Sequence, residues 1–131
     1  MSESKPQTQV FDVVVIGGTP GGISAAIAAA RSGCRVAITE HHDHLGGMST
    51  SGLGKSDIEN REMIGGIFAE FVAHVRSYYA ERFGEDSQDF ALCREGYYFE
   101  PSVAEAIFDR MLENECERIC VLRSHSVQSV E

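Results

Sequence analysis

The chain of 131 residues has no long apolar run and no apolar N-terminus. Its longest apolar stretch, Ala25–Ala30, is short and rich in alanine, whereas a membrane-spanning helix needs about 20 apolar residues. The polar residues 1–9 lack the apolar core of a signal peptide, and we expect them to be a disordered leader. These absences predict a cytoplasmic protein that does not bind a membrane.

Positive charge is also scarce. The 11 lysines and arginines face 20 aspartates and glutamates, so the formal net charge is −9, and no local cluster of basic residues offsets it. This balance argues against a nucleic acid or an anionic membrane as a partner. The hydrophobic content of 43% and the charged content of 24% are typical of an ordinary globular domain with a core of its own.

The four cysteines form no CxxC pair. Cys116 and Cys120 are four positions apart, but no second pair or nearby histidine completes a tetrahedral metal site. Cys34 and Cys93 stand alone in the sequence. We therefore interpret all four as buried free thiols.

The first third of the chain predicts a strand, a helix and a second strand. Val10–Ile16 is rich in β-branched residues and too short for a helix, so it reads as a strand buried on both faces. Pro20 suits the first turn of a helix, and Gly33 suits the position just after its end. The second strand, Arg35–Thr39, follows so closely that the two strands must be parallel, with a right-handed crossover.

The turn between the first strand and the helix, Gly17–Gly22, is rich in glycine. Gly17 permits a tight exit from the strand, and Gly22 permits the helix to pack closely on the sheet. Thr19 stands where glycine is usual, and its hydroxyl could donate to a phosphate oxygen. The helix N-terminus favours an anion, and Glu40 is placed to accept hydrogen bonds from ribose hydroxyls. Together these features predict a dinucleotide site.

A second glycine-rich segment, Leu45–Gly52, lies in the long loop Glu40–Ser56. A long loop inside a compact unit is usually functional. An NAD site does not need a second glycine cluster here, whereas backbone that passes close to a flavin and its pyrophosphate does. The loop therefore favours FAD over NAD. Two alternatives stay open: an NAD-binding module of a dehydrogenase, and a truncated fragment that binds nothing well.

The middle of the chain predicts one long helix and one irregular segment. Apolar residues recur at helical spacing from Arg61 until a stop near Gly84. The acidic segment Glu85–Tyr97 shows no period and is expected to be irregular.

The last third predicts a helix and two β segments. A helix begins at Glu100–Ser102, and Glu105 stands three residues after Ser102, as in a capping box. Ile119–Leu122 follows as a third parallel strand. Ser126–Val130 alternates in hydrophobicity and reads as the start of a further β segment.

These elements define an α/β fold class: a Rossmann-like three-layer FAD/NAD(P)-binding fold with a parallel sheet in the order 3-2-1. The sheet is incomplete, because no strand is available for the other side of the first strand, which is left as an exposed apolar edge. We therefore expect residues 10–131 to be the N-terminal part of an FAD-binding domain. A further region of the protein, or another chain, would cover this edge.

The motifs resemble a known family. The segments DVVVIGGTPGGISAAIAAARSG, VAITE and HLGGMSTSG resemble the FAD-dependent oxidoreductases of the glutathione-reductase-like superfamily, and are most similar to bacterial members with a GGTPGGI turn and an LGGM loop. The later segment YYFEPSVAEAIFDRMLEN is similar to the second helix of the same family. The resemblance covers residues 11–131. It implies FAD as the cofactor, with redox chemistry carried by the flavin, and it leaves the small-molecule substrate unknown.

The resemblance also implies which residues bind the cofactor, and none that is catalytic. Family members are longer and carry a second flavin motif and a substrate domain without counterpart in these residues. Val127 is implied to contact adenine through its backbone. The implied cofactor-binding residues are Gly17, Gly18, Thr19, Pro20, Gly21, Gly22, Glu40, His41, Gly46, Gly47, Met48, Ser49 and Val127.

The histidines after the second strand raise the question of a metal. His41, His42 and His44 stand beside Asp43, but adjacent loop residues rarely converge on an ion without further ligands. We expect no metal site, and covalent attachment of flavin to one of these histidines stays open.

Overall fold

A computed structural model describes residues 8–131, so most of the predicted leader, residues 1–9, lies outside the described part. The structure contains three strands, four α-helices and three short 3₁₀ helices within these residues. In chain order they are β1 (Val13–Ile16), α1 (Pro20–Arg31), β2 (Val36–Glu40), η1 (Gly47–Ser49), η2 (Arg61–Met63), α2 (Gly66–Phe83), α3 (Gln88–Leu92), η3 (Arg94–Gly96), α4 (Pro101–Glu113) and β3 (Ile119–Arg123).

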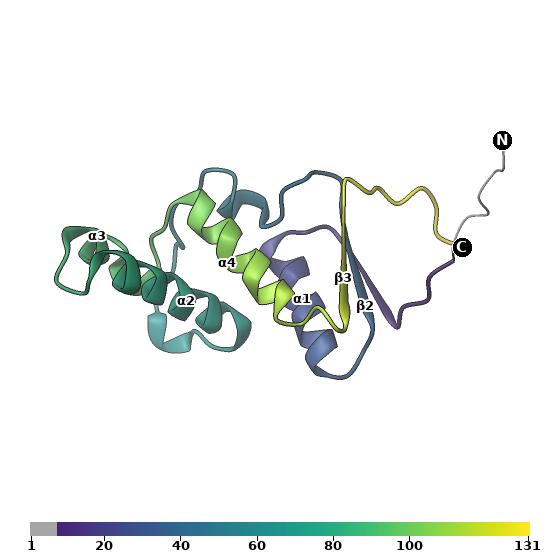
Figure 1. Ribbon diagram of the computed structural model, residues 1–131, viewed down its shortest axis with the longest axis horizontal. Helices are drawn as coiled ribbons and strands as arrows, with labels where there is room; N and C mark the ends of the chain where they lie inside the picture. Colours follow the sequence, from purple (N-terminus) through teal and green to yellow (C-terminus); the bar gives the residue numbers. More distant parts are fainter. Residues whose placement is uncertain (1–7) are drawn as a thin grey trace.

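The three strands form one parallel sheet in the order β1-β2-β3. Val14 lies opposite Ala37 in the first pair, and Ile38 lies opposite Val121 in the second. The sheet stands at one end of the molecule, α1 and α4 lie beside it, and α2 and α3 extend away from it (Figure 1). The predicted strand order and the Rossmann-like α/β class are confirmed.

Helix α1 lies close on the sheet because its inward face is built from small and β-branched side chains. Ile23, Ala26, Ile27 and Ala30 are all at most 1% exposed. Gly33, at φ +96°, follows the helix in the left-handed conformation that favours glycine. The boundaries predicted from Pro20 and Gly33 are therefore confirmed.

One face of strand β1, which carries Val14 and Ile16, is not covered by any of the described residues. Val14 is 54% exposed and Ile16 is 64% exposed, whereas Val13 and Val15 on the other face are half-buried. The prediction that this strand is buried on both faces is wrong for these residues, because the helices cover only one face of the sheet. In the three-layer arrangement a third layer would cover Val14 and Ile16. The predicted exposed apolar edge is confirmed.

The predicted long helix begins later than expected. Arg61–Met63 forms a separate 3₁₀ turn, and Ile64 has an extended backbone. Gly66, at φ +62°, then begins α2, because the chain changes direction there. Helix α2 ends at Phe83 as predicted, and it carries charged residues along its length. No helix within residues 8–131 is both long and apolar enough to cross a membrane.

The segment expected to be irregular, Glu85–Tyr97, contains two short helices. Ser87 caps α3 by accepting a hydrogen bond from the N–H of Phe90 at 3.1 Å. Gly96 packs against α2 so closely that a Cβ would lie 2.1 Å from the carbonyl oxygen of Val72. Sequence periodicity missed these helices because neither is long enough to show a period.

Two predictions for the last third are wrong. Helix α4 has Glu100 as its N-cap, without a side-chain cap. Glu105 Oε1 instead accepts a hydrogen bond from Nδ1 of His44 at 2.6 Å. Ser126–Val130 forms no strand. The chain turns at Ser124 (φ +54°), whose N–H donates to His42 O at 3.1 Å, and His125 N–H donates to Glu40 O at 2.9 Å, so only these two residues are held at the end of β2.

All four cysteines are free thiols, as predicted, but they are not all buried. Cys93 is buried in the core, Cys34 and Cys120 are half-buried, and Cys116 is exposed. Cys116 lies in the turn after α4, where the chain crosses the surface to reach β3. The prediction of burial is therefore wrong for Cys116.

Candidate cofactor site

The glycine-rich turn has the geometry that its sequence predicts. Gly17 has φ +101°, and its N–H donates to Thr39 O at 2.8 Å, so the chain leaves β1 while still bonded to β2. A Cβ on Gly22 would lie 2.0 Å from the carbonyl oxygen of Gly17. Because atoms cannot approach so closely, the helix can follow the strand this tightly only with glycine at position 22.

Thr19 caps helix α1. Its Oγ1 accepts a hydrogen bond from the N–H of Gly22 at 3.2 Å, and its carbonyl oxygen accepts one from Ile23 at 2.8 Å. The hydroxyl hydrogen is left free to donate. Within the described part of the chain, the N–H groups of Thr19 and Gly21 have no acceptor, and Pro20 occupies the first helical position. Free N–H groups at a helix N-terminus form a site for an anion such as a pyrophosphate.

Glu40 lies at the carboxyl end of β2 and is only 9% exposed. Its Oε2 accepts a hydrogen bond from the N–H of Gly18 at 2.8 Å, and its Oε1 accepts one from the N–H of His42 at 3.1 Å. These hydrogen bonds, that of His42 first, lower the pKa of Glu40 below its ordinary value. The carboxylate is therefore ionised at neutral pH, and Oε2 keeps a lone pair that can accept a hydrogen bond from a ribose hydroxyl.

The second glycine-rich segment packs directly against the first. The N–H of Gly46 donates to the carbonyl oxygen of Gly18 at 2.6 Å. Leu45 is fully buried beneath this contact, and a Cβ on Gly18 would lie 2.0 Å from its Cδ2. Gly47 faces the turn from the other side, with Pro20 Cδ 3.5 Å from the position of a Cβ. Two segments separated by a helix and a strand thus form one backbone-lined surface.

The end of this surface is open. Met48 is 71% exposed, and Ser49 beside it on η1 is half-buried. Gly46 holds the preceding turn at φ +102°, and Thr50 Oγ1 donates to the carbonyl oxygen of Leu45 at 2.7 Å. The loop is therefore fixed by its own hydrogen bonds and leaves Met48 exposed at the end of the surface.

A cavity of about 320 Å³ opens at the same edge of the sheet. Gly17, His41 and Val127, which the resemblance implies as contacts, all line it. The sequence interpretation missed its other lining residues, which come from the ends of all three strands: Ile16, Thr39, His125 and Ser126. Their position at the carboxyl ends of parallel strands is the signal that could have found them.

Thr39 is the most informative of these residues. Its buried Oγ1 has no hydrogen-bond partner within the described residues, and it lies beside the cavity. Buried hydroxyls without partners are rare, and an unpaired one at a cavity often belongs to a ligand contact. The glycine-lined surface, the ionised Glu40 and this cavity together fit a dinucleotide such as FAD.

The histidines lie at the rim of the site. His41 is 64% exposed at its side chain, and its Nδ1 lies 2.7 Å from Glu40 Oε1. Its ring lies against the ring of His42, with centroids 3.7 Å apart. Glu40, His41 and His42 bring potential metal-ligand atoms within 4.8 Å of one another. His44 is hydrogen-bonded to Glu105 instead. No ligand beyond these three joins the group in the described residues, and the expectation of no metal stays a prediction.

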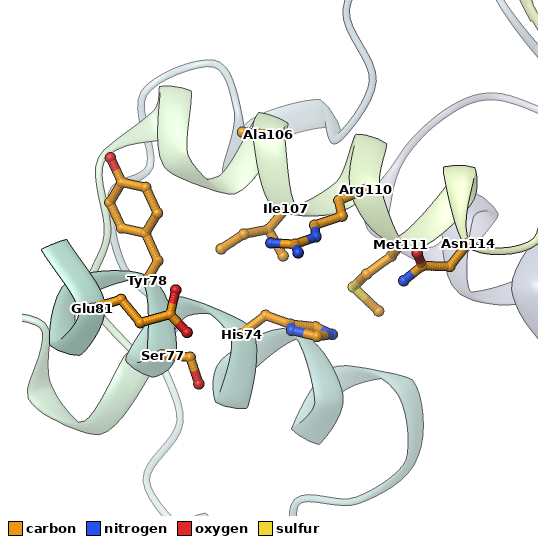
Figure 2. Close-up of a pocket in the computed structure, with 9 residues that line it drawn as sticks. All are labelled: His74, Ser77, Tyr78, Glu81, Ala106, Ile107, Arg110, Met111 and Asn114. Atoms are coloured by element: carbon orange, nitrogen blue, oxygen red, sulfur yellow. The ribbon is translucent and has the colours of Figure 1, made fainter.

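A separate cavity of about 500 Å³ lies between α2 and α4 (Figure 2). Ile107 and Met111 of α4 form its apolar floor, and His74 of α2 and Arg110 of α4 project into it from opposite sides. None of the predicted cofactor residues lines this cavity. The predicted cofactor residues Gly17, His41 and Val127 line the smaller cavity at the sheet edge instead.

Two comparisons with known proteins found similarities. A family model described as FAD dependent oxidoreductase matches residues 12–131. A similar solved structure is the crystal structure of THI4 from Thermovibrio ammonificans, with 21% sequence identity and a TM-score of 0.48. The match covers 86% of this chain and 38% of that chain.

Proposed function

Because the chain belongs to the family of FAD dependent oxidoreductases, we propose that residues 10–131 form the part of a flavin-dependent oxidoreductase that binds the nucleotide half of FAD. FAD is the cofactor of this family. The observation that carries the assignment of the site is the pair of hydrogen bonds made by the backbone of Gly18. Its N–H donates to the Glu40 carboxylate, and its carbonyl oxygen accepts from Gly46 of the second glycine-rich segment.

Each part of the site has one role in this proposal. The free N–H groups of Thr19 and Gly21, the Thr19 hydroxyl and the dipole of α1 hold the pyrophosphate. Glu40 accepts hydrogen bonds from the ribose. The cavity lined by His41, Thr39 and Val127 holds the adenine.

The second segment extends the same surface toward the rest of the cofactor. Gly46 and Gly47 let the backbone approach the pyrophosphate, and Met48 and Ser49 lie against the flavin side. When bound, the flavin supplies the hydride or electron chemistry, and the protein orients it and excludes water. No residue in this part of the chain is proposed as a catalytic acid or base.

The proposal is tested by purifying the chain, recording its visible spectrum after incubation with FAD, and identifying any cofactor released by denaturation. Flavin absorption with FAD released supports it. A colourless protein that binds NAD instead would identify an NAD module, and a protein that binds neither would be a fragment without a complete site. Either result contradicts the assignment of FAD to this surface.

A variant of the turn locates the site. Gly17→Val introduces a branched side chain at φ +101°, a conformation that β-branched residues do not adopt without strain. We expect loss of FAD retention. The matched control is Gly84→Val, which has a similar φ of +85° with no atom within 4 Å of a Cβ, but lies at the end of α2, away from the glycine-rich segments. Wild-type retention by the Gly17 variant would contradict the placement of the pyrophosphate.

We also propose that the free edge of β1 is covered in the working protein. Val14 and Ile16 are exposed along a strand whose outer backbone groups have no partner strand in the described residues. Unpaired apolar edges promote aggregation, so natural proteins cover them. A further region of the protein or another chain would add a strand there.

A further inference from the structure

Three arginines far apart in the sequence line one cavity of about 480 Å³, which we call the arginine cavity. Arg61 comes from η2, Arg76 from α2 and Arg94 from η3. The other lining residues are Phe90, Ala91 and Glu95. The cavity lies among α2, α3 and η3, at the end of the molecule away from the sheet (Figure 1). Its volume is within the range of about 300–1,000 Å³ that is usual for small-molecule sites.

The charge of the arginine cavity is opposite to that of the chain. Three of the 11 lysines and arginines meet there, in a protein with a net charge of −9. The sequence shows no local basic cluster, because this one is assembled only by the fold. Like charges repel, so three guanidinium groups gather around one cavity at a cost that a bound anion would offset.

Each of the three arginines makes a cation–π contact with an aromatic ring, and their charges are only partly neutralised. Aromatic rings lie beneath all three guanidinium groups, at 4.3 Å from Arg61 to the Tyr97 ring, 5.5 Å from Arg76 to the Phe90 ring and 6.0 Å from Arg94 to the Tyr98 ring. Stacking on a ring leaves the N–H groups at the guanidinium edge able to donate.

Two of the three arginines form ion pairs with carboxylates. Arg61 is paired with Glu95, and Arg76 is 3.8 Å from the exposed Glu85. Arg94 has no ion pair within residues 8–131. The group that lines the cavity therefore keeps an excess of positive charge.

The backbone at the edge of the cavity is strained. Arg94 has φ +50° and Glu95 has φ +64°, and both are non-glycine residues in the left-handed region. Residues in such strained conformations tend to cluster at functional sites. Packing of the next residue, Gly96, against the Val72 carbonyl fixes this conformation. The strained backbone therefore directs the Arg94 and Glu95 side chains to the cavity.

We propose that the arginine cavity binds a phosphate group, either free or as a phosphate monoester. Three guanidinium groups from three elements match the several oxygens of a tetrahedral dianion, because each planar group can donate to a different oxygen. A single carboxylate has two oxygens in one plane and would leave at least one arginine unused. The site is independent of the FAD site, with which it shares no residue.

Inorganic phosphate is the probe, titrated into the protein by isothermal titration calorimetry at constant ionic strength in chloride. We expect one site, and weakening of binding by about tenfold in Arg76→Gln and in Arg94→Gln. The matched control is Arg82→Gln, which removes the same charge from α2 outside the cavity and should leave the dissociation constant unchanged. Glu95→Gln removes the carboxylate that competes for Arg61 and should tighten binding by about threefold.

The variants distinguish this site from the glycine-rich turn, which could also bind phosphate. Binding that is unaffected by Arg76→Gln and Arg94→Gln would overturn the proposal, as would no binding at all. Glycerol phosphate, tested in the same way, distinguishes a phosphate monoester from free phosphate as the ligand. Tighter binding than free phosphate identifies a monoester site, and weaker binding identifies a site for the free ion. Equal binding of succinate would show a general anion site and overturn the specificity for phosphate. The result holds whether or not FAD binds.

Discussion

The carboxylate of Glu40 accepts a hydrogen bond from the backbone N–H of Gly18 at 2.8 Å, and so joins the end of β2 to the turn after β1. The same carboxylate accepts a hydrogen bond from His42 N–H, and the carbonyl oxygen of Gly18 accepts one from Gly46. Glu40 thus fixes the backbone of the proposed pyrophosphate site in addition to its expected contact with ribose. A residue predicted as a ligand contact is also part of the support of the site.

Glu40→Gln should destabilise the protein by about 1–3 kcal/mol at pH 7, because an amide cannot accept both backbone N–H groups as a buried carboxylate does. The pKa of Glu40 is lowered by folding, so its contribution is present above the ordinary value of 4.5 and is lost as the pH falls through the lower pKa of the folded state. Thermal unfolding of both proteins from pH 7 to pH 3 measures this. The difference between them should shrink below pH 4.5. A constant difference would contradict the role of the charge.

Gly22→Ala should destabilise the protein by about 1–3 kcal/mol and reduce FAD retention, because its Cβ would lie 2.0 Å from the Gly17 carbonyl oxygen. Gly21→Ala is the matched control for stability. Its Cβ would meet nothing closer than Thr19 Oγ1 at 3.8 Å, and alanine favours a helix over glycine by about 1 kcal/mol. The urea concentration at the midpoint of unfolding should therefore fall in Gly22→Ala and rise in Gly21→Ala. Equal destabilisation would show that the turn excludes any side chain.

Tyr79→Phe should destabilise the protein by about 1–2 kcal/mol, because the buried hydroxyl donates to Glu100 Oε2 at 2.7 Å and accepts from the Glu100 N–H at 3.1 Å. These bonds join α2 to the start of α4. Tyr78→Phe is the control, since the hydroxyl of Tyr78 makes no hydrogen bond within the described residues. Urea unfolding of both variants measures the difference.

The titration of Tyr79 provides an independent readout. Burial raises its pKa from 10.0 to about 12. Its contribution to stability is therefore complete below pH 10 and is lost as the pH rises through about 12. Ultraviolet absorbance should show a tyrosine that ionises near pH 12, and this step should be absent in Tyr79→Phe. A late step that persists in the variant would assign it to another tyrosine.

Val14→Lys should weaken self-association of the isolated chain by about tenfold, because a charge on an exposed edge strand opposes pairing with another edge. Val14 is 54% exposed on β1. The control is Met63→Lys, which places the same charge at a residue that is 81% exposed and lies outside the sheet. Sedimentation velocity measures the association. An equal effect of both variants would indicate a general effect of charge.

The unit from Phe11 to Glu40 could be predicted almost completely from the sequence. Its strands, helix and turn are set by residues close together in the chain: the left-handed φ at Gly17, the helix start at Pro20 and the stop at Gly33 all depend on local backbone geometry. The second glycine-rich segment was expected to pass close to the same cofactor, but its packing on the first segment was not predicted. The structure supplies the contact, from Gly46 to Gly18.

Two wrong predictions concern segments whose structure depends on residues distant in the sequence. Ser126–Val130 alternates like a strand, but a strand needs a neighbour, and the hydrogen bonds of Ser124 and His125 direct the chain to the loop after β2 instead. The side chain of Glu105 suits a capping box, but it bonds to His44. Competing partners that are distant in the sequence decided both cases.

The sequence by itself determined the strand–turn–helix–strand unit and its chemistry, because turns, caps and short periods depend on neighbours in the chain. Only the tertiary structure decided where distant groups meet. It placed Thr39 and Val127 at one cavity and gathered Arg61, Arg76 and Arg94 at another. Such meetings depend on how whole elements pack, and packing is set by the combined burial of many side chains rather than by any one segment.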